Sequence, residues 1–426
     1  MNNNFFEVLR PGINTTFQDQ GRFNLQHFGV APSGCMDYKS FSVANALLSN
    51  DKTEGVLEFA YQGPLLKLIK GQTKFAITGN VHFQIINSKN KTVTGECNRT
   101  YDLEEGERVD ILATNKTVYG YFAVEGGFSV SPFCNSVSTL SRANIGPNEG
   151  KKINVKNKIF FKKNRQEKNN YTINVSSGNN NLIKVLRGPQ YDYFSDSSKK
   201  DFFSKNYKIS NLTDRMGMRL EGTVLKNVVS SNIRSEGIIK GSIQVPADGQ
   251  PIVLLNDHPT IGGYPKIANV ISADYDLLIQ NVPGTNLSFK YIELEEAEKA
   301  FELYSENIKK TLDFVDTNKD PHEYLKRYLK EQKYKDWFNR NYPNYTIYDA
   351  VGLSISDYLS MKRELFPESE TNNEEELNKE KKPDNTNFKP TITHKTKTSF
   401  DEFIDERTLV SHNAFGNKEM KIKILE

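Results

Sequence analysis

Short apolar runs separated by turns are the feature that most constrains the fold of this chain. From the start to about residue 290, runs of four to eight residues rich in β-branched and aromatic side chains are bounded by Gly, Pro, Asn or Asp. A parallel, doubly wound sheet needs a helix between each pair of strands, and most gaps here lack helical periodicity. The pattern therefore predicts barrels or sandwiches. The expected strands are residues 74–79, 82–86, 108–114, 118–124, 152–155, 158–161, 182–186, 241–246, 251–256, 268–273, 275–282 and 287–294.

One helix and one domain boundary are expected within this β-rich part. Residues 38–50 carry apolar side chains at helical spacing and end on Ser-Asn, which is typical of a helix and its stop. Residues 163–181 are polar, Asn-rich and poor in apolar anchors, as in a linker or an exposed hairpin. We therefore expect a mainly β protein with a first barrel-like domain at 1–170 and a second at 171–295.

The C-terminal third differs in character. Apolar and aromatic residues recur three or four apart from about residue 296, and this spacing predicts a helical extension over 296–366 that contains the single tryptophan, Trp337. The next segment, 367–400, has almost no core-forming residues, so we expect a disordered linker there. Residues 401–426 recover some hydrophobicity and form a separate C-terminal segment.

Charge and cysteine content exclude several classes of function. Lys and Arg total 56 against 53 Asp and Glu, and a net charge of +3 gives no reason to expect nucleic acid or a membrane as partner. The N-terminus does not resemble a signal peptide, and no apolar run is long enough to span a bilayer. The three cysteines lack metal-ligand spacing, so we expect reduced thiols, a cytoplasmic protein and no metal site.

The segment NDHPTIGGYP, residues 256–265, is the strongest candidate for chemistry. Five apolar residues place Asp257 at the end of a buried strand. Gly262 and Gly263 would allow positive φ or a close approach of the backbone to a ligand. Such a turn can present amide groups and a carboxylate to a small polar substrate. The alternative is an ordinary hairpin in which Asp257 bonds only its own turn.

A series of motifs in fixed order resembles one family. The segments QDQGR, AVEGG, DRMGMRLEG, IQVPADGQPIVLL and GGYPKIA, over about residues 6–295, are similar to the carboxyltransferase-type family that includes the C-type subunit of 5-oxoprolinase, allophanate hydrolase subunit 2-like proteins and urea carboxylase. The resemblance implies two cyclophilin-like β-barrel domains. Pro259 and Ile261 replace a Gln and a Thr of the family turn, and Val137 replaces an Arg, so the family's substrate does not carry over directly.

The resemblance implies an ATP-dependent 5-oxoprolinase. This chain would be its C-type subunit, which hydrolyses 5-oxo-L-proline to L-glutamate together with a B-type (allophanate hydrolase subunit 1-like) and an A-type (LamB/YcsF-like) subunit. It has no phosphate-binding loop of its own, so ATP would be used through the complex and the chain alone would be inactive. One alternative is carboxyl transfer to urea or an amide with biotin as cofactor. The other is a non-enzymatic partner that antagonises a B-type kinase inhibitor.

Specific residues follow from the matched motifs. Arg22 and Arg215 are expected to contact a carboxylate or phosphate, although each could instead tie loops together as an ion pair. The predicted catalytic residues are Asp257, Thr260 and Tyr264. The predicted substrate-binding residues are Arg22, Asp37, Arg215, Gln244, Gly262 and Gly263.

Overall fold

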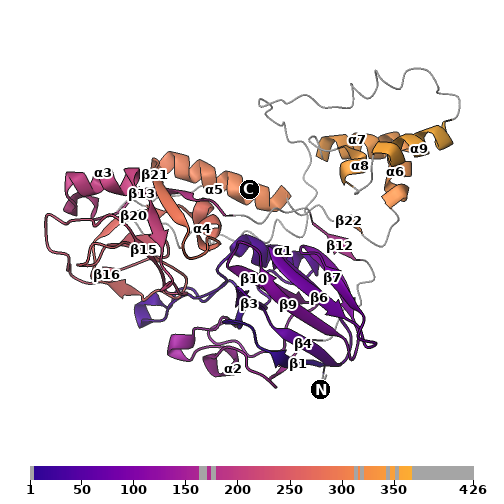
Figure 1. The fold of residues 1–426 in the computed structure, drawn as a ribbon, viewed down its shortest axis with the longest axis horizontal. Helices are drawn as coiled ribbons and strands as arrows, with labels where there is room; N and C mark the ends of the chain where they lie inside the picture. The colour runs from indigo at the N-terminus through magenta and orange to yellow at the C-terminus, as the bar shows by residue number, and fades with distance from the viewer. Residues whose placement is uncertain are drawn as a thin grey trace. The chain divides into compact units, whose positions relative to one another are not determined.

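A computed structural model of the chain describes residues 4–162, 170–173, 179–310, 315–316, 321–341, 346–350 and 355–366. The described residues fall into two compact units. The first comprises 4–162, 173 and 179–310, and the second comprises 170–172, 315–316 and the described residues from 321 to 366 (Figure 1). The expected linker at 367–400 and segment at 401–426 lie outside the described residues, and the expected domain boundaries remain predictions.

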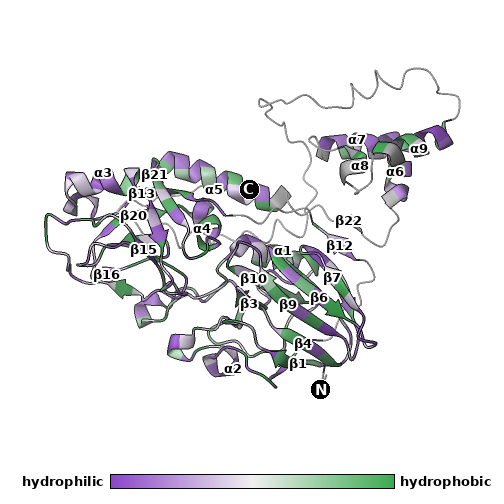
Figure 2. Cartoon of the chain, viewed as in Figure 1, coloured by the Kyte–Doolittle hydropathy of each residue, from purple (hydrophilic) through white to green (hydrophobic). Residues whose placement is uncertain are grey.

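The first half of the larger unit consists of two antiparallel sheets around one core. Phe6 of one sheet and Phe122 of the other meet edge to face at 5.8 Å between ring centroids, and both are fully buried. Polar and apolar residues largely alternate along β6 (Val81–Ile86) and β9 (Arg108–Thr114), so each presents one face to the core (Figure 2). One sheet runs in the order β11 (Lys158–Phe160), β1 (Phe5–Arg10), β4 (Leu65–Lys70), β9 (Arg108–Thr114), β6 (Val81–Ile86), β7 (Thr92–Gly95). The other runs in the order β2 (Thr16–Gln18), β3 (Val56–Ala60), β10 (Tyr119–Val124), β5 (Thr73–Gly79), β8 (Arg99–Leu103).

The expected helix at 38–50 is confirmed as α1 (Tyr38–Leu47), which packs on β5 and β10. Asp37 is its N-cap, and the carboxylate accepts a hydrogen bond from the Ser40 amide at 2.9 Å. Short helical turns lie before α1 at Gln26–Phe28 and after it at Ser141–Ala143 and Pro147–Gly150 (α2).

The second half of this unit is a closed seven-stranded barrel, which confirms the mainly β fold expected from the sequence. Apolar side chains fill it, among them Val185, Ile243 and Phe289. The strands run in the order β13 (Leu182–Arg187), β20 (Lys266–Val270), β17 (Ser242–Gln244), β18 (Ile252–Leu254), β15 (Gly217–Glu221), β14 (Tyr207–Ile209), β21 (Asn286–Tyr291). Outside the barrel lie α3 (Asp196–Ser204) and the two-residue strands β16 (Glu236–Gly237) and β19 (Ile261–Gly262), which pair with each other.

Residues 152–155 form no strand, so the strand expected there is wrong. The strand expected at 275–282 is also wrong, because most of this run is helix α4 (Ser272–Ile279). Its buried apolar residues Tyr275, Leu278 and Ile279 are spaced three and four apart, so they lie on one helical face. A short apolar run is ambiguous between a buried strand and a buried helix, and packing against β13 decides it here.

The helical extension is confirmed where it is described. Helix α5 (Leu294–Lys310) belongs to the larger unit, where Tyr304 donates a hydrogen bond to Asp276 of α4 at 2.5 Å and Ile308 packs on Ala46 of α1. The smaller unit has its own core of Leu325, Tyr328, Phe338, Ile347 and Tyr358. Its elements are β12 (Tyr171–Thr172), β22 (Val315–Asp316), α6 (Pro321–Lys330), α7 (Gln332–Asn341), α8 (Ile347–Ala350) and α9 (Ile355–Leu365).

Candidate functional site

Asp257 and Arg215 lie together at the end of the barrel that meets the two sheets. Arg215 precedes β15 and Asp257 follows β18, and these strands are antiparallel neighbours. Their hydrogen bonding continues past the strand ends, where the Asp257 amide donates to the Arg215 carbonyl at 2.9 Å. The backbone register therefore sets the two side chains against each other.

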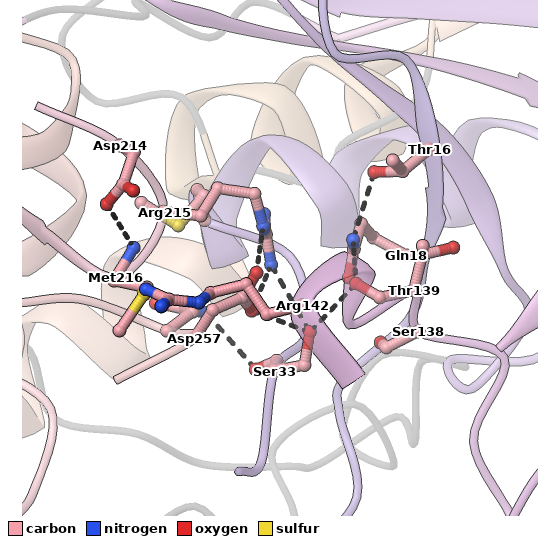
Figure 3. A network of polar contacts seen from close by, with 12 residues as sticks. Thr16, Gln18, Ser33, Ser138, Thr139, Arg142, Asp214, Arg215, Met216 and Asp257 are labelled. Carbon is pink, nitrogen blue, oxygen red and sulfur yellow. Dashed lines mark hydrogen bonds and ion pairs between the residues drawn. The ribbon is translucent and has the colours of Figure 1, made fainter. Parts of the chain in front are cut away.

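Arg215 is the centre of a buried ionic network (Figure 3). Its Nε donates to Asp257 Oδ2 at 2.9 Å and its Nη2 to Asp257 Oδ1 at 3.0 Å, a bidentate pair. Its Nη1 contacts Oε1 of Glu58 on β3, and its Nη2 also donates to the Gly34 carbonyl at 2.7 Å. The side chains of Arg215, Asp257 and Glu58 are only 14%, 10% and 2% exposed.

Burial and charge act in opposite directions on these groups. Burial raises the pKa of Glu58 above its ordinary value, although the Arg215 guanidinium opposes this shift. Burial alone would lower the pKa of Arg215, but the carboxylates of Asp257 and Glu58 raise it well above the usual range. One cation thus balances two buried carboxyl groups, and Glu58 also accepts hydrogen bonds from the Met36 amide at 2.7 Å and the Tyr121 hydroxyl at 2.8 Å.

Arg22 lies in a neighbouring loop and is 1% exposed. Its Nη2 donates to the Ser138 carbonyl, whereas its Nε and Nη1 have no hydrogen-bond partner among the described residues. Burial lowers its pKa, against the attraction of Asp19 and Asp257. The loop is held by Asp19, whose carboxylate accepts hydrogen bonds from Ser136 Oγ at 2.7 Å and from Ser138 Oγ at 2.5 Å.

Two glycines fix the same loop against its neighbour. Gly21 and Gly34 have φ values of +98° and +95°, and a Cβ on Gly34 would lie 2.8 Å from the Gln20 carbonyl oxygen. The carbonyl of Pro32 accepts from the Arg22 amide at 2.8 Å. This close backbone contact places Ser33 beside Asp257, and the Ser33 Oγ donates to Asp257 Oδ1 at 2.7 Å.

Asp37 is placed as a structural group. Its carboxylate accepts hydrogen bonds from Ser40 and, at 2.8 Å, from Nε2 of Gln280 just after α4. The Gln280 Oε1 accepts from the amides of Val118 and Tyr119, so this one buried amide links the barrel to the sheets. A substrate contact by Asp37 stays a prediction.

The remaining predicted residues lie at the other end of β17. Ser242, at the start of β17, is level with the end of β18 that leads to Asp257, whereas Gln244 pairs with Ile252 at the far end. Gly262, Gly263, Thr260 and Tyr264 belong to the β19 turn, which packs towards Gln244.

The glycines of this turn act through their size. Neither Gly262 nor Gly263 has a positive φ, contrary to one of the two options expected. A Cβ on Gly262 would lie 2.6 Å from Gln244 Nε2, and one on Gly263 would lie 3.1 Å from the Ile233 carbonyl oxygen. Thr260 is partly buried, and Tyr264 is 40% exposed. The predicted site residues thus form two groups.

Several residues of these groups were not expected to belong to a site. Glu58 lies on β3, and no local sequence pattern shows that it meets Arg215. His258 is buried, its pKa is lowered by burial, and its Nδ1 lies 2.6 Å from the Pro259 carbonyl oxygen. Lys266 follows the GGYP turn and Glu236 precedes β17, and both meet near Gln244.

In the part of the chain that the structure describes, no three His, Cys, Asp or Glu side chains are grouped as metal ligands. No helix in the same residues combines the length and the apolar character needed to cross a bilayer.

Comparison with known proteins gives these groups a context. The C-type subunit of 5-oxoprolinase from Escherichia coli K12 is 33% identical over 294 residues, which cover 69% of this chain and 93% of that protein. The urea amidolyase of Lachancea kluyveri is 27% identical over 69% of this chain but only 17% of its own length. The solved structure of Kluyveromyces lactis urea carboxylase superposes with a TM-score of 0.64 at 25% identity and covers 72% of this chain and 29% of its own. This chain therefore spans less than a third of each of these two larger proteins.

The family profile named "Carboxyltransferase domain, subdomain A and B" matches residues 28–291, which span both the sheets and the barrel. This match confirms the resemblance carried by the ordered motifs. The chain belongs to the carboxyltransferase domain family, with subdomains A and B.

Proposed function

We propose that this chain is the C-type subunit of an ATP-dependent 5-oxoprolinase that hydrolyses 5-oxo-L-proline to L-glutamate with A- and B-type subunits in the cytoplasm. The observation that carries the proposal is the Arg215 network, a buried cation held by two carboxyl groups between the two halves of the larger unit. The similarity to the C-type subunit of a bacterial 5-oxoprolinase, over nearly the whole length of that protein, supports the choice of substrate.

The geometry favours an orienting role for Asp257 over a role as general base. Both of its oxygens accept hydrogen bonds from Arg215, and Oδ1 also accepts one from Ser33. Both oxygens are therefore engaged with donors of the protein, which places the carboxylate to hold these donors and not to face an attacking water. Asp257 would instead fix Arg215 and Ser33, which would orient the polar groups of the substrate.

Hydrolysis adds water across the lactam C–N bond and produces the second carboxylate and the amine of glutamate. Opening an unstrained amide ring requires the free energy of ATP. This chain has no phosphate-binding loop, so the nucleotide is assigned to the complex. Thr260 and Tyr264 remain predicted catalytic residues on the β19 turn.

Reconstitution tests this proposal. The purified chain is mixed with A- and B-type subunits, and 5-oxoproline-dependent ATP hydrolysis and glutamate formation are measured. We expect activity only from the complete mixture. Turnover by the chain alone, or no turnover by a complex that assembles, would contradict the proposal.

Carboxyl transfer to urea or a related amide is the second candidate. The likeness to urea carboxylase over 72% of the chain favours it. It requires biotin, with a biotin carboxylase and a carrier protein from other chains. Addition of these components with bicarbonate, ATP and urea distinguishes the two reactions, because only carboxyl transfer fixes labelled bicarbonate in the product.

A further inference from the structure

A buried lysine at the far end of the barrel holds a carboxylate that comes from outside the barrel. The Lys266 side chain is 1% exposed, and its Nζ contacts Glu236 Oε1. The Gln190 Nε2 donates to the same oxygen at 2.8 Å. Gln190 is itself fixed to the Lys266 backbone, because its Oε1 accepts from the Lys266 amide at 3.2 Å and its own amide donates to the Lys266 carbonyl at 3.3 Å.

A third donor stands beside these two and is unused. Gln244 is directly opposite Lys266 in the β17–β20 ladder, so the two side chains extend from the same face of the sheet. Gln244 is 6% exposed, and its Nε2 has no hydrogen-bond partner among the described residues. A buried amide donor without a partner is costly, so its presence needs an explanation.

Glu236 reaches this position from a short strand at the surface. It comes from β16, which pairs with β19 through two residue pairs, Glu236 with Gly262 and Gly237 with Ile261. Its side chain is 43% exposed, and space around Gly237 is open. The backbone of Gly262 packs against Gln244 Nε2, and a side chain at this position would not fit, because its Cβ would lie 2.6 Å from that nitrogen. The carboxylate that Lys266 holds thus comes from one strand of the β16–β19 pair, which we call the β16–β19 flap.

We propose that Lys266, Gln190 and Gln244 form a binding site for the carboxylate of a small organic acid, and that Glu236 occupies this site until the acid displaces it. The ammonium group supplies charge, and the two side-chain amides supply directed donors. An entering carboxylate can use the Gln244 donor that Glu236 leaves idle once the β16–β19 flap lifts. The choice of 5-oxo-L-proline as the acid rests on the proposed function, whereas the carboxylate site does not.

The alternative is a purely structural ion pair between Lys266 and Glu236. The two readings differ in the behaviour of Glu236→Gln. If Glu236 competes with an external carboxylate, its neutralisation frees the site and strengthens binding. If the pair is only structural, the variant is destabilised and carboxylates do not restore it.

The test uses the full chain and isothermal titration with 5-oxo-L-proline, acetate and the neutral lactam 2-pyrrolidone. We expect Glu236→Gln to lower the Kd for 5-oxo-L-proline at least about tenfold. The Kd for 2-pyrrolidone, which has no carboxylate, should not change. Glu221→Gln, which removes an exposed carboxylate from β15 of the same barrel, is the matched control and should behave as the wild type. Adding Gln244→Met to Glu236→Gln should reverse most of the gain.

Each outcome decides the matter. Unchanged carboxylate affinity in Glu236→Gln overturns the site. Tighter acetate binding without tighter 5-oxo-L-proline binding supports the site but contradicts the proposed substrate. If Glu236→Gln folds poorly, refolding in sodium acetate is compared with refolding in sodium chloride of equal ionic strength. Rescue by acetate supports the site, and equal recovery in both salts overturns it.

Discussion

Replacement of Arg215 by Met tests whether the buried network is balanced by this one cation. Arg215 is 14% exposed and pairs with Glu58 and Asp257, which are 2% and 10% exposed. Removing one partner of a buried pair costs about 3–5 kcal/mol, because the remaining charge stays buried without compensation. For the larger unit, that loss lowers the Tm by roughly 5–8 °C at pH 8, because the entropy of unfolding grows with the number of residues.

The pH dependence of this loss follows from Glu58. Burial raises its folded-state pKa above the unfolded value, so its contribution to stability is fully present below the unfolded pKa and is lost as pH rises through the folded pKa. In Arg215→Met the opposing attraction is gone, so the folded pKa rises further. The variant should therefore regain stability as the pH falls from 8, because Glu58 takes up a proton at a higher pH than in the wild type.

The assay is thermal unfolding of both proteins followed by circular dichroism from pH 5 to pH 8. Adding Glu58→Gln to Arg215→Met should raise the Tm at pH 8 and flatten the pH dependence. Lys151→Met, which breaks an exposed pair with Glu149, should leave the Tm unchanged. The reasoning is refuted if Arg215→Met melts within about 2 °C of the wild type at pH 8, or if its deficit is the same at pH 5.

Three further predictions concern the same unit. Asp257→Asn should lower reconstituted 5-oxoprolinase activity by about 10²-fold while the circular dichroism spectrum is retained, and activity within a factor of about two would contradict a role in orientation. Burial, with the charge of Asp37, raises the pKa of Asp276 to about 6, so the contribution of Asp276 to stability should fall by about 3 kcal/mol as pH rises from about 4 to 6. Asp276→Asn should remove this part of the pH dependence in urea titrations, and an unchanged slope would contradict it. Gly34→Ala should lose about 1–3 kcal/mol in urea unfolding, whereas Gly29→Ala, which has a φ of +79° but no atom within 4 Å of the added Cβ, should lose less; equal losses would contradict the steric argument.

Local patterns predicted the elements whose character is local. The alternation along β6 and β9 and the helical spacing of α1 and α5 are visible in a few residues, and these elements are confirmed. The prediction of a strand at 275–282 was wrong because the apolar residues of α4 suit a strand or a helix equally well. Packing against the neighbouring strand β13 decides the choice.

The candidate site was less accessible from the sequence. The turn at 256–265 was expected to present backbone amides and the Asp257 carboxylate together. Asp257 instead joins Arg215, whereas Gly262 packs against Gln244 at the other end of β17. Register depends on pairing across the barrel, which no single segment encodes. The meeting of Glu58 with Arg215 was missed for the same reason, since the two residues belong to different halves.

The contacts between those halves also determine how soon the N-terminal half can complete its folding during synthesis. Arg215, the partner of Glu58, lies 157 residues downstream in the sequence, and Gln280, the partner of Asp37, lies 243 residues downstream. At about 5–20 residues per second, ribosomal synthesis separates Glu58 from Arg215 by roughly 8–30 s. During that interval the first half has a carboxyl group destined for burial but no counterion, and its first helix lacks the barrel side chains that join it. The N-terminal half is therefore expected to remain incompletely ordered until the barrel has been translated, and to be the part that engages chaperones during synthesis.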